Sequence, residues 1–423
     1  IGTTQLDANL AHDIYKAQLA LYFERNPESK TIFNLSSNDH LGHLIFDVWG
    51  HEPLETTKTG KNKLDDDYLE TIKSNPVIEK LIDFKKLNKL LSTYVDGILE
   101  RQIDGIIYTS MLQYGTTSGR YSSTNPNLQN QPRIKDDESG LSELVLKYVN
   151  AIRAGFVSGK GYKIVNADYS ALEPRCFSHV SGDANLINVW TKGEDIYSRV
   201  AIDVFKVQNV SALKSEPNYL GKIKKEFRQK SKVFTLAVPY GAEESRISDE
   251  MGVSYQEARK IIQDYLGAYP GLRKYMATCN VNAKAKGQAI SQFGRIRHLT
   301  EVKTIHTLYG DKILDYKYAK SRNLLDVRRT FKHGLNASKN FPIQSLAASI
   351  VNRAMIEVTK LFKLHNIDGY VALQVHDEIT CIVREDHSEK AAELLKHAME
   401  QTTKISVPLI AEPQIADNWA DAK

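Results

Sequence analysis

The chain has 423 residues, which is more than one hydrophobic core usually holds, so two or three subdomains are expected. Hydrophobic residues make up 42% and charged residues 25%, which is ordinary for a globular protein. The net charge of +5, from 56 Lys and Arg against 51 Asp and Glu, permits a polyanionic partner but does not require one.

The cysteine spacing and the hydropathy exclude several classes of protein. The three cysteines lie far apart and form no CxxC pair, so neither a zinc site nor a disulfide framework is indicated. No apolar run approaches the length of a membrane span, and the N-terminus lacks the pattern of a signal peptide. The first residue is Ile1 rather than Met, which is consistent with a fragment of a longer protein.

The first third of the chain predicts helices followed by a loop. Residues 5–25 and 76–104 carry helical periodicity, and the second helix has Pro76 near its start and Gly105 just past its end. Residues 114–135 lose periodicity and are rich in small and amide side chains, which predicts an ordered loop. The basic residues of the second helix fit either a solvated face or a nucleic-acid contact: Lys80, Lys85, Lys86, Lys89 and Arg101.

The middle of the chain begins with a predicted strand over residues 162–170 that ends in Asp168. Residues 184–300 are predicted to be mostly helical and to include a basic helix at 221–236. Residues 301–335 are predicted to be irregular and basic.

The last part predicts a helix over 344–364. Residues 370–383 alternate on both sides of a central His-Asp-Glu, which predicts a hairpin with charges at its turn. A final helix over 386–402 leads to a short apolar stretch.

Two acidic positions interrupt apolar strand patterns. Asp168 follows one strand, whereas Asp377 and Glu378 lie at the tip of the hairpin. A carboxylate beside a core strand is costly unless it is paired or binds a metal. Two such aspartates could hold two Mg²⁺ ions about 4 Å apart, the arrangement used for in-line phosphoryl displacement. Alternatively, each aspartate only makes a turn, and their separation of more than two hundred residues does not show that they meet.

Four residues of the basic helix recur at four-residue steps and therefore share one face: Arg228, Lys232, Leu236 and Tyr240. Two cations followed by apolar and aromatic groups could hold a triphosphate at one end and a base at the other. An ordinary basic surface helix is the alternative. Pro239 should bend the last turn. The sequence contains neither a P-loop nor a GxGxxG motif.

Taken together and in order, these motifs resemble family A DNA polymerases, the bacterial DNA polymerase I type that many phages share. The matching segments are TSGRYSSTNPNLQNQP (117–132), DYSALEPR (168–175), RQKSKVFTLAVPYG (228–241), NFPIQSLAAS (340–349), QVHDEI (374–379) and NWADAK (418–423). The resemblance covers almost the whole chain, and it depends on the order of the motifs rather than on any one of them.

The resemblance implies an α+β right-hand polymerase fold with a thumb, a palm built on an antiparallel sheet, and helical fingers. The expected segments are an N-terminal helical segment at 1–32, the thumb at 33–118, the first part of the palm at 119–190, the fingers at 191–335 and the second part of the palm at 336–423. The implied reaction is template-directed addition of deoxynucleotides to a primer 3′ end by two-metal-ion phosphoryl transfer, with release of pyrophosphate.

The resemblance also assigns roles to single residues. Asp168 and Asp377 become ligands of two Mg²⁺ ions, for which Mn²⁺ can substitute, with Glu378 beside them and the Tyr169 carbonyl as another ligand. The implied nucleotide-binding residues are Arg228, Lys232, Leu236, Tyr240 and Glu173, and Glu173 matches the steric gate against a ribose 2′-hydroxyl. The implied primer-template contacts are Arg120, Gln129, Asn130, Asn340, Gln344 and His376. Amide donors suit this task because minor-groove acceptors occupy similar places in every base pair.

Several positions depart from the family's pattern, although none removes a catalytic carboxylate. Leu236 stands where Phe or Tyr is usual, Asn336 where Arg is expected, and Ser349 where Asp is expected; Ala171 and Pro174 alter the first catalytic motif. These departures indicate a divergent, phage-like member. Members with Tyr at the position of Leu236 tend to accept dideoxynucleotides and members with Phe reject them, so this chain is expected to reject them.

The expected partners are primer-template DNA and deoxynucleotides, with no membrane, for a monomer in the cytoplasm of a bacterium or a phage-infected cell. No exonuclease activity is expected from this chain, although the natural protein could carry an exonuclease domain upstream or bind replisome partners. Three alternatives are a single-subunit RNA polymerase, a non-catalytic DNA-binding subunit and a metal nuclease. Glu173 and Glu378 argue against the first, the intact aspartates and cations against the second, and the basic aromatic helix against the third.

Overall fold

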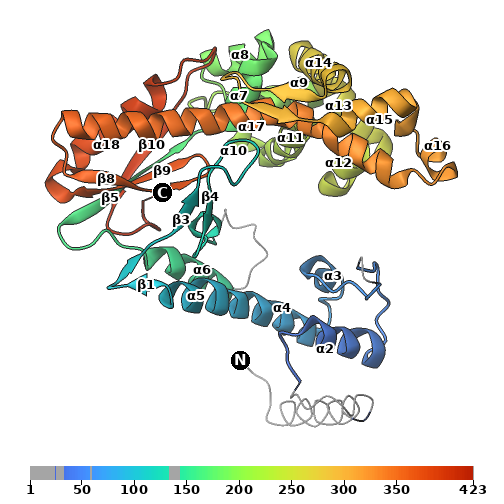
Figure 1. Ribbon diagram of the computed structural model, residues 1–423, viewed down its shortest axis with the longest axis horizontal. Helices are drawn as coiled ribbons and strands as arrows, with labels where there is room; N and C mark the ends of the chain where they lie inside the picture. Colours follow the sequence, from blue (N-terminus) through green and yellow to red (C-terminus); the bar gives the residue numbers. More distant parts are fainter. Residues whose placement is uncertain (1–23, 25–32, 58–59, 133–142, 423) are drawn as a thin grey trace. The chain divides into compact units, whose positions relative to one another are not determined.

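The computed structural model describes residues 24, 33–57, 60–132 and 143–422. The helix predicted over 5–25 therefore lies outside the described residues, apart from Glu24. The chain forms two compact units (Figure 1). Unit 1 comprises Ile1–Tyr108 and Gln131–Arg153, and unit 2 comprises Thr109–Asn130 and Ala154–Lys423.

The described part of unit 1 is mainly helical. Its elements are α2 (Asn38–Gly42), the π-helix η1 (His43–Val48), α3 (Asp66–Thr71), α4 (Pro76–Lys89), the π-helix η2 (Leu90–Asp96), α5 (Gly97–Leu99), β1 (Gln102–Ile103), β2 (Ile106–Ile107) and α6 (Glu143–Ala154). The long helix predicted over 76–104 is thus α4, η2 and α5 in succession, and it ends at Leu99. Asn75 caps its start by accepting a hydrogen bond from the Val77 N–H at 3.0 Å, and Pro76 occupies the first turn.

Unit 2 is built on a four-stranded antiparallel sheet in the order β10-β5-β9-β8. The strands are β5 (Tyr162–Tyr169), β8 (Gly369–Val375), β9 (Glu378–Arg384) and β10 (Ala411–Ala416). The predicted strand and hairpin are therefore confirmed, and a two-residue turn at 376–377 joins β8 to β9. Along β9, Ile379, Cys381 and Val383 are fully buried, as the alternation predicted.

Two helices cover the sheet: α17 (Leu325–Leu364) and α18 (Ser388–Gln401). Figure 1 shows α17 as one long helix beside β8 and β9. The predicted helix over 344–364 was too short, because α17 begins 19 residues earlier and continues through Pro342. Dense burial on both sides of Pro342 explains why the helix tolerates the lost hydrogen bond, since Phe341 and Ile343 are fully buried.

The prediction that residues 301–335 are irregular was wrong. They form most of α15 (Thr300–Tyr309), the 3₁₀ turn η5 (Gly310–Leu314), α16 (Tyr316–Ser321) and the start of α17. Apolar residues spaced among the charges make a second core, which includes Val302, Ile313, Phe331 and Leu335. The high density of basic residues concealed this helical periodicity.

The remaining helices lie between β5 and α17 in sequence. They are α7 (Leu172–Ser181), α8 (Ala184–Thr191), α9 (Ile196–Phe205), α10 (Leu220–Ile223), α11 (Lys225–Ala237), α12 (Glu244–Met251), α13 (Tyr255–Ala268) and α14 (Pro270–Lys286). The predicted basic helix is thus split at Lys224, and Pro239 lies in a 3₁₀ turn, η4 (Val238–Tyr240), as expected of a bent last turn.

Two short hairpins complete unit 2. One pairs β3 (Ser110–Leu112) with β4 (Ser122–Thr124), and the 3₁₀ turn η3 (Leu128–Asn130) follows it. The other pairs β6 (Gln288–Ile290) with β7 (Ile296–His298) and was not predicted. None of the helices in the described part of the chain is both long enough and apolar enough to cross a membrane. The predicted α+β class with an antiparallel sheet is confirmed, whereas the subdomain boundaries stay predictions.

Candidate active site

The register of β5 against β9 brings the two predicted metal-binding aspartates together. Asp168 pairs with Glu378 across the two strands, and the Tyr169 N–H donates to the carbonyl oxygen of Asp377 at 3.2 Å. The Asp168 side chain is exposed, and the Asp377 side chain is 24% exposed. Both aspartates therefore lie at the same end of the two central strands, a proximity that sequence spacing alone did not show.

Glu378 differs from these aspartates because it is buried and its carboxylate already accepts a hydrogen bond within the protein. Its Oε1 accepts a hydrogen bond from the indole Nε1 of Trp419 at 2.8 Å, and only 1% of the residue is exposed. The same part of the sheet is tied to the C-terminal segment by Asn166, whose Nδ2 donates to the carbonyl of Ala422 at 2.9 Å. Glu378 is thus placed to orient the strand next to Asp168 and Asp377.

The turn that carries Asp377 is held by amide side chains. Gln374 donates from Nε2 to the carbonyl oxygen of His376, and Gln129 donates from Nε2 to the Gln374 carbonyl at 3.1 Å and to its Oε1 at 3.2 Å. His376 is exposed and has a φ of +54°. The structure therefore joins Gln129, a predicted primer-template residue, to the predicted catalytic turn.

A compact polar network links four of the predicted site residues. Arg120 Nη2 lies 2.5 Å from Glu173 Oε1 and 3.7 Å from Asp377 Oδ1, and the Tyr240 hydroxyl donates to Glu173 Oε2. Burial and the neighbouring Glu173 raise the pKa of Tyr240, so its hydroxyl stays protonated and donates. Burial alone would lower the pKa of Arg120, but the charges of Glu173 and Asp377 raise it above its ordinary value.

The two predicted triphosphate-binding cations on α11 have different surroundings. Lys232 is exposed. Arg228 forms a bidentate pair with Asp195, from Nε at 2.8 Å and from Nη2 at 3.0 Å, and its guanidinium lies 5.3 Å from the ring centroid of Tyr197. Burial would raise the pKa of Asp195, but hydrogen bonds from Arg228 and Ser198 lower it below its ordinary value.

Leu236 and Tyr240 are the other two residues of the four-residue face predicted from the sequence. Phe234 and Ala237 enter the main core, whereas Leu236 remains partly exposed. Tyr240 lies in η4 and reaches Glu173, as described above. The four-residue face predicted from the sequence is therefore present on α11 and continues into the turn.

The remaining predicted primer-template residues lie on two elements. Asn340 and Gln344 are one turn apart on α17, and both are partly exposed, whereas Asn130 is exposed at the end of η3. The buried Oδ1 of Asn340 has no hydrogen-bond partner among the residues that the structure describes. A buried acceptor without a partner is costly, so this amide is suited to receive a ligand donor.

Asn336, which stands where the resemblance expected Arg, is used locally. Its Nδ2 donates to the carbonyl of Gly241 at 3.4 Å. Lys339 brings a cation to the same place, because a Cβ built on Gly241 would lie 2.6 Å from Lys339 Nζ. Gly241 also has a φ of +86°, so both the backbone conformation and the crowding favour glycine there.

Some residues of the site were missed at the level of sequence. The motif QVHDEI contains Gln374 but gives no role to it, and no sequence pattern marks Asp195 or Lys339. The available signal for Gln374 was its position at the start of QVHDEI. Asp195 and Lys339 gave no comparable signal, because a single charge in a helical region is usually a surface residue.

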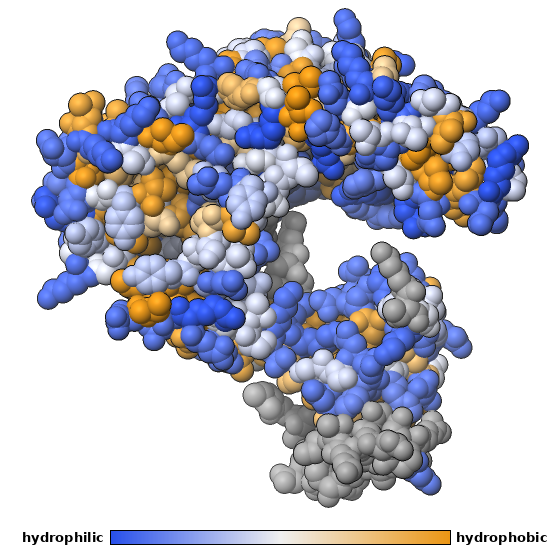
Figure 2. Space-filling view, viewed as in Figure 1, coloured by the Kyte–Doolittle hydropathy of each residue, from blue (hydrophilic) through white to orange (hydrophobic). Residues whose placement is uncertain are grey.

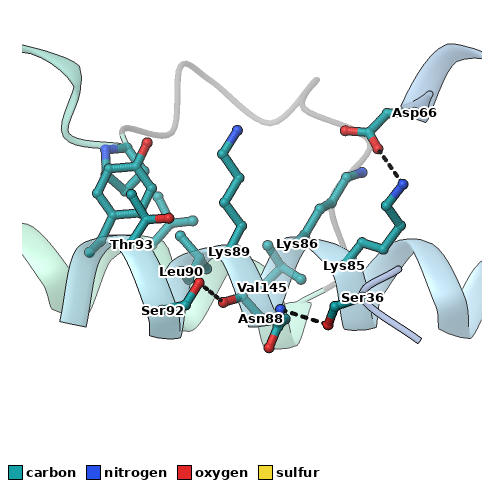
Figure 3. A pocket seen from close by; sticks show the side chains of 13 residues that line it. Ser36, Asp66, Lys85, Lys86, Asn88, Lys89, Leu90, Ser92, Thr93 and Val145 are labelled. Atoms are coloured by element: carbon teal, nitrogen blue, oxygen red, sulfur yellow. Dashed lines mark hydrogen bonds and ion pairs between the residues drawn. The ribbon is translucent and has the colours of Figure 1, made fainter. Parts of the chain in front are cut away.

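A separate basic pocket of about 530 Å³ lies in unit 1. Figure 3 shows Lys85, Lys86 and Lys89 extending from the same side of α4, with Asp66 reaching toward Lys85. The Lys85–Asp66 distance is 3.8 Å, and Lys86 lies 3.7 Å from Glu70. The face of unit 1 that carries α3 and α4 is largely hydrophilic (Figure 2).

Comparison with known proteins identifies the family. A family model described as "DNA polymerase family A" matches residues 3–421. The thermostable DNA polymerase I of Thermus filiformis is 31% identical over 396 residues, covering 92% of this chain and 42% of the relative, and DNA polymerase I of Geobacillus stearothermophilus is 28% identical over 424 residues, covering 99% and 43%. The chain thus spans less than half the length of these relatives.

A solved structure shows the same fold. It is described as the "POL domain of Pol1 from M. smegmatis complex with DNA primer-template and dNTP". Its TM-score is 0.76 at 27% sequence identity, and the match covers 99% of this chain and 66% of that one. From the family match, the relatives and this fold, we conclude that the chain belongs to DNA polymerase family A.

Proposed function

We propose that this chain is a DNA-directed DNA polymerase that extends a primer 3′ end with deoxynucleotides and releases pyrophosphate, using two divalent metal ions. The observation that carries the proposal is the β5–β9 register, which sets Asp168 and Asp377 at the same end of the two central strands. The M. smegmatis neighbour supports the substrate class, because its structure is described with a DNA primer-template and a dNTP.

The oxygen donors at this end of β5 and β9 suit Mg²⁺. They are the carboxylates of Asp168 and Asp377, with the main-chain carbonyl of Tyr169 as a third oxygen. In the described part of the chain, no three or more His, Cys, Asp or Glu side chains gather into a metal cluster. Mg²⁺ does not need one, because it usually keeps several waters and is bound by one or two carboxylates plus substrate phosphates. When bound, the ions would activate the primer hydroxyl and neutralise the leaving pyrophosphate, and Mn²⁺ could replace them.

We assign the incoming nucleotide to the face of α11. Lys232 is exposed and able to meet a triphosphate directly. Arg228 would have to share or exchange its bidentate contact with Asp195 to do the same. Glu173 is fixed from two sides by Arg120 and Tyr240, so displacing its carboxylate to admit a ribose 2′-hydroxyl would break both contacts.

We assign the primer-template to the polar residues around Asp168 and Asp377 and on α17: Arg120, Gln129, Asn130, Asn340, Gln344 and His376. Amide and guanidinium donors at these positions can test the shape of a base pair without selecting its sequence. The monomeric state and the cytoplasmic location expected from the sequence are part of the same proposal.

Primer extension tests the proposal. The protein is incubated with a 5′-overhang primer-template, Mg²⁺ and either deoxy- or ribonucleotides, and Asp168→Asn serves as the inactive control. We expect template-dependent extension with deoxynucleotides that EDTA stops and Mn²⁺ restores. Preferential use of ribonucleotides would favour an RNA polymerase, binding without extension would favour a non-catalytic subunit, and cleavage would favour a nuclease.

The proposal assigns polymerisation alone to this chain, because the family match accounts for residues 3–421. A primer with a 3′ mismatch tests this part. We expect slow extension of the intact mismatched primer. Shortening of that primer before extension would show a proofreading activity and contradict this part of the proposal.

A further inference from the structure

Arg295, between β6 and β7, bridges two segments that are far apart in sequence. Its Nη1 donates to the Ser118 carbonyl oxygen at 3.1 Å, to Ser345 Oγ at 2.6 Å and to Ser349 Oγ at 3.3 Å. Two of these acceptors lie on α17, and the third lies in the loop that precedes β4. Among the residues that the structure describes, no carboxylate forms an ion pair with Arg295, so all of these contacts are to neutral oxygens.

The loop is shaped around the Arg295 guanidinium. A Cβ built on Gly119 would lie 2.4 Å from Arg295 Cζ, and Gly119 has a φ of +85°. Both facts exclude an ordinary side chain at position 119 without a shift of the loop or the arginine. Asn352 of α17 donates from Nδ2 to the Gly119 carbonyl at 3.3 Å, and Thr116 Oγ1 donates to the Arg120 carbonyl at 2.7 Å.

The next residue along this loop is Arg120, the cation that contacts Glu173 at 2.5 Å and Asp377 at 3.7 Å. The backbone on which Arg120 depends is therefore tied to α17 through Arg295 and Asn352. We propose that Arg295 is a positioning residue, which fixes the loop 116–120 so that Arg120 holds Glu173 and reaches Asp377. The inference rests on the proposed function for the roles of Glu173 and Asp377.

The chemistry of the acceptors explains why an arginine is needed. Its planar guanidinium can lie against the Gly119 backbone while the two N–H bonds of Nη1 are shared among three oxygens. The two serine hydroxyls on α17 anchor the group without neutralising it, and Ser349 stands where the family resemblance expects Asp. A lysine keeps the charge but loses the planar group, so charge alone should not replace Arg295.

A double-mutant cycle on kcat/KM for deoxynucleotides tests the inference. The variants are Arg295→Met, Arg120→Met and the double variant, with Arg329→Met as the matched control on an arginine that is 78% exposed. We expect Arg295→Met to lower kcat/KM by at least about tenfold and to cost little more once Arg120 is gone. Additive losses would overturn the inference, because an arginine that acted alone, for example as a DNA phosphate ligand, would not depend on Arg120.

Arg295→Lys and Gly119→Ala keep the test decisive if Arg295→Met does not fold. Arg295→Lys replaces Arg295→Met in the same double-mutant cycle. Gly119→Ala disturbs the same contact from the loop, because the added Cβ would meet the Arg295 guanidinium. Both should also weaken the exclusion of ribonucleotides, because Glu173 loses its fixed partner. A normal deoxy/ribo ratio in both variants would contradict the inference.

Hydrogen exchange separates this inference from the proposed function, because it needs no activity. Amide exchange over residues 116–120 should speed up in Arg295→Met, or in Arg295→Lys if Arg295→Met does not fold, and stay unchanged in Arg329→Met. Unchanged exchange would refute the positioning role even in an active enzyme. Faster exchange in the variant, together with a wild-type chain that extends no primer, would instead refute the proposed function and leave the contact between Arg295 and the loop supported.

Discussion

Asp168 and Asp377 lie at the same end of the two central strands, and replacing either carboxylate with its amide tests their assignment as metal ligands. Asp168→Asn or Asp377→Asn should abolish extension while primer-template binding survives, because DNA affinity comes mainly from phosphate contacts elsewhere. The measurements are single-turnover extension and DNA affinity. The matched control is Asp386→Asn, an exposed aspartate after β9 that pairs with Arg384. A variant that keeps more than about a hundredth of wild-type kcat, a loss under roughly 3 kcal/mol, would contradict the assignment for that residue.

Glu173 accepts hydrogen bonds from both Arg120 and Tyr240, so the loss of its carboxylate can be compared with the loss of one of these contacts. Glu173→Ala should lower discrimination against ribonucleotides by orders of magnitude, measured as a ratio of kcat/KM values. Tyr240→Phe removes one of the two contacts and should lower the ratio less. An unchanged ratio in Glu173→Ala would place the gate elsewhere.

At the residue scale, the sequence predicted which residue types make up the candidate site, an assignment that stays a prediction, but not how these residues are held. Asp168 and Asp377 were identified because each interrupts an apolar strand, a pattern that is visible without a fold. The hydrogen bond from Trp419 to Glu378 and the pair between Arg228 and Asp195 join residues that are distant in sequence. No local pattern encodes such contacts, so they require the three-dimensional structure.

On α11, the partial exposure of Leu236 between the buried Phe234 and Ala237 favours the view that it faces the nucleotide rather than the core. Leu236→Tyr should therefore raise dideoxynucleotide incorporation, and the matched Leu236→Phe should leave it low. If Leu236 instead packs in the core, both larger side chains should lower the melting temperature through overpacking. Lower melting with unchanged dideoxy/deoxy selectivity in both variants would refute the nucleotide-facing position.

At the element scale, periodicity did not predict β10, but it predicted the other three strands of the main sheet, which are β5 and the β8–β9 hairpin. These segments combine strong alternation with turn residues, so local and tertiary preferences agree. The failures occurred where tertiary packing overrides a local signal. Pro342 is an ordinary helix stop in sequence, yet α17 continues through it between buried neighbours. The charges of residues 301–335 likewise concealed an apolar stripe that becomes evident only as a second core.

For the whole molecule, the order of the motifs along the sequence predicted both the α+β fold and the family. Composition contributed little to this result, because a net charge of +5 fits many proteins. The division into units was less predictable. The described residues of Gln131–Arg153 belong to unit 1 together with residues that precede Thr109, and only long-range contacts reveal such a return of the chain.

The mild net charge makes the location of the cations decisive for DNA binding, and the basic pocket of unit 1 can be tested directly. Lys85 and Lys86 have carboxylates nearby, whereas Lys89 has no ion pair among the described residues. If the pocket contacts phosphates, replacing all three lysines with alanine should weaken binding. The slope of log K against log salt should then decrease in magnitude by between about 0.9 and 2.7, corresponding to one to three lost contacts.

The matched control for this measurement replaces three exposed lysines of unit 2: Lys360, Lys363 and Lys390. It makes the same change in net charge, so a purely long-range effect would weaken binding equally in both triple variants. A change of slope confined to the pocket variant would assign direct phosphate contacts to α4. An unchanged slope in the pocket variant would instead show that these lysines form a solvated helix face, the alternative that the sequence left open.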